Sequence, residues 1–544
     1  MSNDFKPPTA DPQDSSTEPG GADWLGEMPE PEPDRGDALP EILVSPGSLA
    51  KIATQAESAL LRANAPIFQR GGVLVRPATF TVRASGGRET QAIGLLQLTV
   101  TAMIDRMARA AIWQRPSVKK EDRIIDPPGE VARIILSRAG EWRFLNLAGV
   151  ITAPCLRRDG SLLVEPGYDR ETRMFLALPP GFRMPAIPER PTKADAQAAL
   201  AKLDALLGGF PFVTALDRSV ALSALMTPIL RPAMDAAPFH FIVAPAPGSG
   251  KSYLVDLASA IATGQVCPVS NVSTNPEELE KNLTGLLLAG FAVASLDNIE
   301  GEVGGSLLCQ ATERPMIRLR PLGTSQIATI ESTATIFGTG NNAVVTGDMV
   351  RRALVCNLDA GVERPELRHF DFDPLKTILE NRGAFIAAIL TIARAWRVAG
   401  GPDQSPLASY SDWRRLVRDP LIWLGQPDAA GSMEQNRAGD PELTELRSML
   451  AAWAAVPGAR GGLTAREAIA LAEKRAPTVM GEPTGLAWPA LAEALEGVCG
   501  DRGGLNPRRL GVWLRTHAGR VVDKKRFTAR SGHADIARWA ITDA

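Results

Sequence analysis

The sequence predicts an α/β protein with a nucleotide-binding core, and three stretches near the middle of the chain support this prediction. Residues 239–263 read as an apolar strand, a tight Gly/Pro loop and an amphipathic helix. Residues 291–298 and 334–342 are apolar runs that close in an acid and in amides, respectively. Short apolar runs that alternate with helical patterns are typical of an α/β fold.

The first stretch has the order of a P-loop, because its loop ends in Gly-Lys-Ser directly before the helix. Backbone N–H groups of such a loop surround a β-phosphate at the helix N-terminus, where the helix dipole favours an anion. Lys251 is expected to reach the β- and γ-phosphates, and Ser252 is expected to hold Mg²⁺. The predicted nucleotide-binding residues are Gly248, Ser249, Gly250, Lys251, Ser252 and Tyr253.

The P-loop pattern has one departure, because Pro245 stands where the motif has its first glycine. The alternative interpretation is a chance Gly-Lys-Ser in a surface loop. The apolar strand before the loop and the helix after it favour the P-loop, since the motif requires both.

Bulk properties exclude several classes of protein. A chain of 544 residues with 45% hydrophobic residues can form several domains with buried cores. Its 59 basic and 61 acidic residues nearly cancel, so a nucleic-acid surface would have to be local. Five widely spaced cysteines and four histidines argue against a zinc site or a disulfide framework. No apolar stretch approaches the length of about 20 residues that spans a bilayer, so we expect a cytoplasmic protein without membrane contacts.

Composition and patterning divide the chain into segments. The first holds ten acidic and two basic residues with eight prolines, which predicts disorder. The predicted segments are a disordered acidic tail (1–40), an α+β accessory module (41–192), a helical collar (193–237), a P-loop ATPase core (238–372), a helical segment (373–439) and a winged-helix-like DNA-binding domain (440–544).

The accessory module reads as short strands and one helix. Strands are expected at 72–77 and 80–84, and a helix near 94–110. Asp159-Gly160 between two apolar runs predicts a β-hairpin. The module has no obvious paired carboxylates or metal cluster, so we do not interpret it as a working primase, and we interpret its arginines as solvated faces.

Asp297 ends an apolar strand about 45 residues after the P-loop. A carboxylate there can bind Mg²⁺, usually through water; the alternative is an ordinary buried strand followed by a turn. Many such ATPases place a glutamate directly after this acid, but here the next residue is Asn298. Glu300 is the nearest carboxylate that could polarise the attacking water, and Glu313 is a weaker candidate.

Residues 316–332 alternate with period two around a Gly-containing turn and predict a β-hairpin. Arg318 and Arg320 lie two apart and therefore share one face of a strand. In a ring-shaped ATPase such a hairpin could hold arginines over a channel for single-stranded DNA. The alternative is an exposed hairpin whose arginines serve solubility.

The third stretch and the segment after it supply further candidates. Asn341 or Asn342 could bind the γ-phosphate or the attacking water, with a plain turn as the alternative. Arg351 and Arg352 are expected at a helix start, where an arginine could reach a neighbouring subunit's nucleotide. The planar guanidinium spreads its donors over the oxygens of a transferring phosphoryl group.

The order GSGKS, SLDN, CQATERPMIRLRPLGTSQ, IFGTGNN, VRRALVCNL resembles the superfamily-three helicases, particularly the phage and poxvirus type of primase-associated helicase. No single motif is highly specific, but the order and spacing of the five together are. The resemblance is best over residues 238–372 and extends more weakly to 412–428 and 166–175. It implies an α/β fold with an AAA+-like P-loop ATPase core that assembles as a hexamer and translocates on single-stranded DNA.

The resemblance also implies residue roles. Lys251 and Ser252 would contact phosphate and Mg²⁺, and Asp297 would contact the metal. Asn341 would be the sensor, Arg318 and Arg320 would face DNA, and Arg351 or Arg352 would act across a subunit interface. With Glu300, the predicted catalytic residues are Lys251, Asp297, Glu300, Asn341, Arg351 and Arg352.

The C-terminal segment predicts a winged helix that binds DNA. Thr464 and Glu467 form the pattern of a capping box, and Asn506-Pro507 opens another helix before two strand-like runs. Between residues 505 and 538 nine Lys/Arg face two Asp/Glu. A winged helix that contacts protein is the alternative. The predicted DNA contacts are Arg508, Arg509, Arg515, Lys524 and Lys525.

Three functional hypotheses remain open. The first is an ATP- and Mg²⁺-dependent DNA helicase of a phage or mobile element, a homo-hexamer on single-stranded DNA, with a separate primase or polymerase as a further candidate partner. The second is an ATP-switched DNA-binding or assembly protein that oligomerises without unwinding, which Asn298 keeps open. The third, a P-loop small-molecule kinase, ranks last because the arginine hairpin and the Arg pair would have no role in it.

Overall fold

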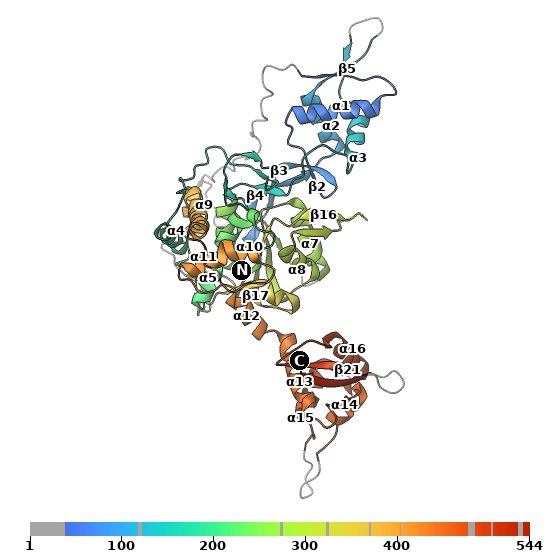
Figure 1. The fold of residues 1–544 in the computed structure, drawn as a ribbon, viewed down its shortest axis with the longest axis vertical. Coiled ribbons are helices and arrows are strands. Elements are labelled where there is room, and N and C mark those ends of the chain that lie inside the picture. Colours follow the sequence, from blue (N-terminus) through green and yellow to red (C-terminus); the bar gives the residue numbers. More distant parts are fainter. Residues whose placement is uncertain are drawn as a thin grey trace, which may run out of the picture.

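The computed structural model describes residues 39–543 apart from short gaps at 118–121, 272–275, 322–325, 369–371, 403, 477–484, 502–503 and 531–536. Almost all of the predicted disordered tail lies outside the described residues. The same holds for the Gly-containing turn of the hairpin at 316–332. Figure 1 shows an elongated molecule with an upper lobe, a central lobe around a sheet, and a lower C-terminal lobe.

A five-stranded parallel sheet forms the centre of the molecule. Its strands are β12 (Phe239–Ala244), β13 (Val269–Asn271), β14 (Val293–Val303), β17 (Thr335–Val345) and β18 (Ala353–Asn357), in the spatial order β13-β14-β17-β12-β18. Every residue of β12 is buried, as expected for a parallel strand covered on both faces. The strand β17 therefore lies between the strand that leads into the P-loop and the strand that carries Asp297.

Helices cover both faces of this sheet. Alternate residues of β12 enter different cores, Ile242 the first and Phe241 the second. The first core includes residues of α4 (Lys193–Ala205), α5 (Ala215–Leu230), α6 (Lys251–Thr263) and α9 (Pro374–Val398). The second includes residues of α7 (Pro276–Ala289), α8 (Ser306–Glu313), β15 (Met316–Leu319) and β16 (Ala328–Glu331).

The segments predicted as a collar and as a helical segment are not separate layers. The helix α4 packs on α9, and α5 packs on the P-loop helix α6. Trp413, Val417, Leu421 and Met433 join the same core. They belong to α10 (Ser411–Trp413), a π-turn (Arg414–Arg418), α11 (Asp419–Trp423) and α12 (Gly431–Ala438).

Residues 41–192 divide between two lobes rather than forming one module. The upper lobe has its own core and consists of β1 (Glu41–Leu43), α1 (Leu49–Arg62), α2 (Val100–Ala110), β5 (Ile112–Arg115), β6 (Arg123–Ile124) and α3 (Gly129–Ser137) (Figure 1). The remaining strands are β2 (Phe68–Arg70), β3 (Val73–Arg83), β4 (Glu89–Gln97), β7 (Gly149–Ile151), β8 (Cys155–Leu156), β9 (Leu162–Leu163), β10 (Gly167–Tyr168) and β11 (Met174–Leu176).

Two local predictions in this region were wrong and one is confirmed. The runs 72–77 and 80–84 form a single strand, β3, because both pair continuously with β4. The helix expected from 94 begins at Val100, since the Thr99 side chain accepts a hydrogen bond from the N–H of Ala102 and caps it there. The hairpin at Asp159-Gly160 is confirmed by the antiparallel pair β8–β9.

Polar contacts join the N-terminal strands to the central lobe. Arg70 donates to the carbonyl of Leu287 at 3.0 Å. Arg88 forms an ion pair with the buried carboxylate of Asp256 on α6 at 2.7 Å. The P-loop helix is therefore contacted by Arg88 from the N-terminal part of the chain as well as by the residues of the first core.

The lower lobe has a core of its own. It consists of α13 (Pro441–Ala454), α14 (Ala465–Ala472), α15 (Pro489–Cys499), β19 (Gly500–Asp501), β20 (Gly504–Leu505), α16 (Pro507–His517), β21 (Lys525–Arg530) and β22 (Arg538–Asp543). The capping box of Thr464 and Glu467 is confirmed, and Asn506 caps α16 as predicted. The two last strands pair antiparallel, which gives helices followed by a hairpin.

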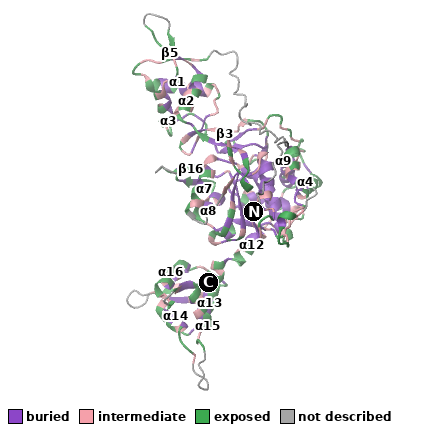
Figure 2. Cartoon of the chain, turned by 180° about the vertical axis from the view of Figure 1, so that it is seen from behind, coloured by how far each residue is buried: buried purple, intermediate pink, exposed green. Residues whose placement is uncertain are grey.

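Figure 2 shows buried residues concentrated in the central lobe, with exposed residues along the outer helices of the upper and lower lobes. Short 3₁₀ turns connect several elements: Ser85–Gly87, Arg231–Ala233, Gly347–Arg351 and Pro365–Leu367. Within the described ranges, no helix is long and apolar enough to cross a membrane.

Candidate nucleotide site

The loop before α6 has the backbone of an anion-binding turn. Gly248 and Gly250 have φ angles of 75° and 96°, values that residues other than glycine rarely adopt. An added Cβ at Gly250 would lie 3.3 Å from the ring of Phe210, so this glycine also makes room for a neighbour. Pro245 is not among the residues with positive φ, and the turn therefore does not need a glycine at that position.

Lys251 is held inside the site by neutral oxygens, and within the described ranges it has no carboxylate in direct contact. Its ammonium donates to the Asn341 side-chain oxygen at 2.7 Å and to the carbonyl of Ala246 at 3.3 Å. Only 8% of the residue is exposed. Burial lowers the pKa of Lys251, and the charge of Asp297 opposes this shift. Neutral oxygens that hold a lysine can be exchanged for phosphate oxygens without breaking an ion pair.

Ser252 of the P-loop helix α6 contacts Asp297 of the strand β14. The Ser252 hydroxyl donates to the Asp297 carboxylate at 3.0 Å, and the Thr339 hydroxyl donates to the same carboxylate oxygen at 2.5 Å. These are hard oxygen donors, which suit Mg²⁺ bound through one carboxylate and substrate phosphates. Among the described residues, no group of three His, Cys, Asp or Glu side chains could hold a metal ion by itself. The donor set fits a phosphate-bound Mg²⁺ and does not form an all-protein cage.

Of the two candidates Asn341 and Asn342, Asn341 is the one whose side chain contacts Lys251. It pairs in register with Ala244 of β12 and with Glu300 of β14, and its amide N–H donates to the Asn298 side chain at 3.4 Å. Asn342 instead donates to the carbonyl of Pro245. The expectation that this strand ends in the amides was wrong, because β14 and β17 stay paired to Val303 and Val345.

The acid strand contains a bulge at the site. Asp297 and Asn298 together stand opposite Thr339, and the pairing resumes with Ile299 opposite Gly340. Asn298 has a φ of 59°, a left-handed conformation in which asparagine is enriched. Exposed Glu300 comes next in the pairing, opposite Asn341.

Tyr253 turns away from the predicted phosphate site. Its hydroxyl donates to Asp373 at 2.6 Å and accepts from the N–H of Leu375 at 3.2 Å. Burial, followed by the hydrogen bond to Asp373, raises the pKa of Tyr253 to about 12. The ring centroid of Tyr253 lies 6.2 Å from that of Phe210, a contact that no sequence motif predicts. The side chain of Tyr253 therefore links the P-loop helix to the start of α9.

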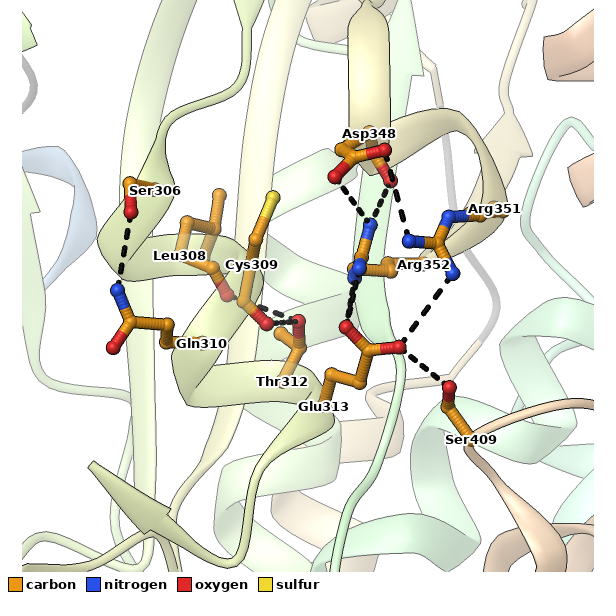
Figure 3. A network of polar contacts seen from close by, with 10 residues as sticks. All are labelled: Ser306, Leu308, Cys309, Gln310, Thr312, Glu313, Asp348, Arg351, Arg352 and Ser409. Carbon is orange, nitrogen blue, oxygen red and sulfur yellow. Dashed lines mark hydrogen bonds and ion pairs between the residues drawn. The ribbon is translucent and has the colours of Figure 1, made fainter.

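The two arginines after β17 differ in their surroundings (Figure 3). Arg352 is 4% exposed, donates through Nε to Glu313 at 2.8 Å and contacts the carbonyl of Asp348 at 2.5 Å. Arg351 is half-exposed and lies 3.5 Å from the same glutamate. Ser409 also donates to Glu313.

This network corrects three expectations. Arg351 ends a 3₁₀ turn and is not at a helix start. Arg352 is fixed within its own chain by an ion pair, so only Arg351 has a side chain exposed for a contact across subunits. Although burial acts to raise the pKa of Glu313, hydrogen bonds from Ser409 and Arg352 outweigh it and leave the pKa below its usual value. With its pKa lowered, Glu313 is a weaker base than an unpaired glutamate.

The predicted hairpin is confirmed as the antiparallel pair β15–β16. Ile317 and Leu319 are buried, whereas Arg318 and Arg320 are exposed on the other face, as the alternation predicted. The second strand is anchored at its end, because Glu331 forms an ion pair with Arg173 at 3.0 Å. The arginines thus stand on a hairpin whose base is tied to the N-terminal strands.

All five predicted basic contacts of the lower lobe are exposed: Arg508, Arg509, Arg515, Lys524 and Lys525. The first three lie on α16, where Arg508 and Arg509 line a shallow depression with Val512 and Thr516. Lys524 sits at the tip of a two-residue turn, with a φ of 64° next to Asp523 at 47°. These residues lie at the surface on α16, on the turn before β21 and at the first position of β21.

Comparisons with known proteins give weak likenesses. Neither a protein-family model nor a curated protein matches the sequence. The apo structure of the NrS-1 C-terminal region matches with a TM-score of 0.34 and 11% identity, covering 86% of this chain and 96% of that one. A shorter structure of the same region gives a TM-score of 0.29 at 13% identity, covering 62% and 68%. A structure of JCV helicase gives 0.20 at 12% identity, covering 46% of this chain and 66% of that one. Likenesses of this size do not identify an activity.

Proposed function

We propose that the chain is an ATP- and Mg²⁺-dependent nucleoside triphosphatase that acts on DNA as a helicase. One observation carries the proposal of an ATP site: Lys251 and Ser252 of α6 hydrogen-bond to Asn341 of β17 and Asp297 of β14, respectively, beside the carboxyl end of β12. Ligands in such sheets bind at the carboxyl ends of the strands. A P-loop lysine, a hydroxyl and an acid at that edge match the needs of a bound triphosphate.

Each residue has a role in this proposal. The N–H groups around Gly248 and Gly250 would cradle the β-phosphate, and Lys251 would exchange its amide and carbonyl partners for phosphate oxygens. Ser252 and Asp297 would hold Mg²⁺, which neutralises charge on the phosphates. Asn341 would orient the γ-phosphate or the attacking water. Glu300 would accept the proton of that water, because it stands next to Asn341 in the pairing.

The proposal of DNA as substrate rests on the exposed basic residues. Arg318 and Arg320 share one face of a hairpin, and α16 carries three exposed arginines in the lower lobe. Phosphate backbones bind surfaces of this kind through charge and release of counterions. A homo-hexameric ring with Arg351 at the subunit interface is part of the same proposal, as is a phage or mobile-element origin with a separate primase or polymerase partner.

A second candidate function is an ATP-switched DNA-binding protein that oligomerises without unwinding. It is favoured by Asn298, which stands in place of a glutamate and bonds to the amide of Asn341. An amide cannot accept the proton of an attacking water. If Glu300 does not take that role, ATP would be bound and hydrolysed too slowly to drive translocation.

The test combines three measurements on the full chain: ATP turnover with and without single-stranded DNA, strand displacement on a forked duplex, and mass with and without ATP. The Lys251→Ala protein, purified identically, controls for contaminating ATPases. DNA-stimulated turnover with displacement supports the helicase. ATP-dependent growth in mass without displacement in either polarity supports the second candidate. Absence of ATP binding contradicts both.

A further inference from the structure

Thr339 lies in the middle of β17, where 1% of its surface is exposed, and touches both residues of the bulge in β14. We propose that Thr339 is a positioning residue for the part of the site that would bind Mg²⁺. Its hydroxyl fixes the orientation of the Asp297 carboxylate and holds the bulge that brings Glu300 opposite Asn341. This inference rests on the proposed ATP·Mg²⁺ site and assigns a role to a residue outside the P-loop and acid motifs.

The Thr339 hydroxyl oxygen makes two hydrogen bonds to adjacent residues of β14. A threonine hydroxyl has one donor and two acceptor sites. The Thr339 hydroxyl donates to Oδ1 of Asp297 at 2.5 Å and accepts from the backbone N–H of Asn298 at 3.1 Å. A single side chain thus binds the side chain of one bulge residue and the backbone of the next.

The Asp297 carboxylate is held through one of its two oxygens. Oδ1 of Asp297 accepts from Thr339 on the neighbouring strand and from Ser252 on the P-loop helix, at 2.5 and 3.0 Å. Two hydroxyls from different elements on one oxygen fix the rotamer of the acid. Neither of them contacts Oδ2, which leaves that oxygen for a metal ion or its water. A carboxylate held before the ligand arrives loses less conformational entropy on binding.

The bulge changes which residues of β14 and β17 lie opposite one another. Leu296 pairs with Gly338, so regular pairing would place Ile299 opposite Asn341. The bulge inserts one extra residue, and Glu300 takes that place instead. Residues paired in register on parallel strands point to the same face of the sheet. The bulge therefore replaces an apolar side chain beside Asn341 with a carboxylate, and the Thr339 hydroxyl is the group that ties this bulge to β17.

The same strand offers a matched control. Thr335 lies four residues earlier on β17 and is completely buried. Its hydroxyl has no hydrogen-bond partner in the described part of the chain. Thr335→Val and Thr339→Val are the same chemical change in the same strand, and only the second removes a contact to the acid.

The experiment measures equilibrium binding of a fluorescent ATP analogue to the full chain during a Mg²⁺ titration, and separately in EDTA. For Thr339→Val we expect the Mg²⁺ concentration at half-maximal binding to rise roughly tenfold or more, the usual worth of a hydrogen bond to a charged group. Binding in EDTA should stay within about twofold of the wild type, because Lys251 and the P-loop are unchanged. Thr339→Ser, which keeps the hydroxyl, and Thr335→Val should both follow the wild-type curve.

A Thr339→Val curve that coincides with the wild type overturns the inference, as does an equal shift in Thr335→Val. If circular dichroism shows that Thr339→Val does not fold, Thr339→Ala takes its place with the same expected shift. A wild-type protein that binds the analogue at no Mg²⁺ concentration contradicts the proposed function itself. That result differs from a failure of the Thr339 inference, in which the wild type binds and the variant matches it.

Discussion

The central site and the basic surfaces hold their polar side chains in opposite ways. Lys251 bonds to Asn341, and Asp297 bonds to Thr339, among parallel strands, whereas Arg318 and three arginines of α16 are exposed. A buried hydrogen-bonded group depends on one arrangement of its partners, so removal of a single atom from the network weakens the whole site. Exposed charges act through their sum, are screened by salt and tolerate single losses.

The Arg351–Arg352 pair shows the same difference within two adjacent residues. Arg352 is buried in an ion pair with Glu313, while Arg351 keeps an exposed side chain. Because the two arginines are adjacent, the sequence alone does not indicate which of them could contact a neighbouring subunit. Their surroundings divide them into a residue that secures the turn and a residue that can contact a partner.

The largest effect is expected in the buried site, from Lys251→Ala. We expect ATP turnover to fall by a factor of about 100 or more, since one preorganised charged donor in a water-poor site contributes about that much. A phosphate-release assay on the full chain measures it. Lys202→Ala, which removes an exposed lysine of α4, is the control and should match the wild type. Equal turnover in the two variants would contradict the assignment of Lys251.

Next in size is a pH effect from His240, which is buried in β12 with Nε2 3.1 Å from the Ser223 hydroxyl. Burial lowers the pKa of His240 to about 3, against 6.5 in an exposed histidine. Between these values the unfolded chain binds a proton that the folded chain does not. Stability conferred by the neutral imidazole is therefore complete above pH 6.5 and is lost as the pH falls toward 3.

Urea unfolding of the wild type and His240→Gln at pH 7.5, 6 and 5 measures this effect. Below pH 6.5 we expect the wild type to lose up to about 1.4 kcal/mol per pH unit more than the variant. At pH 7.5 and above, the two should differ by a constant offset. Parallel curves down to pH 5 would show that His240 is not a source of acid sensitivity.

The smallest effect is expected on the exposed side, from Arg318→Ala combined with Arg320→Ala. Affinity for single-stranded DNA should fall about tenfold at low salt, and the slope of log K against log salt should decrease by about 1.4 if each arginine binds one phosphate. Basal ATP turnover should not change. Fluorescence anisotropy at several salt concentrations measures both quantities.

The control for the hairpin variant is Lys51→Ala combined with Arg62→Ala, which removes the same charge from exposed positions on α1. It should bind DNA like the wild type. A hairpin variant with an unchanged salt slope would remove the hairpin from the DNA-binding surface. A control variant with the same loss would show that net charge, and not the hairpin, governs binding.

The sequence predicted the elements whose signals are local. The P-loop strand and helix, the hairpin with Arg318 and Arg320, and the caps at Thr464 and Asn506 all depend on neighbouring residues, and all are present. The mixed α/β fold with a parallel sheet follows from the same local patterns.

The features that could not be predicted depend on contacts between distant segments. The hydrogen bond from Thr339 to Asp297 joins residues 42 apart, and the ion pair between Arg352 and Glu313 joins residues 39 apart. The bulge at Asn298 leaves no pattern in the sequence, because it exists only in the pairing with β17. Likewise, α4 packs on α9, although the sequence places these helices in two separate predicted segments, 193–237 and 373–439.

We propose above all that Lys251, Ser252 and Asp297 form an ATP·Mg²⁺ site. Calorimetric titration of ATP into the full chain, with Mg²⁺ and with EDTA, tests it most directly. We expect saturable binding by the wild type that weakens when Mg²⁺ is removed, together with loss of that binding in Lys251→Ala. Binding that is absent from the wild type, or unchanged in Lys251→Ala, would contradict it.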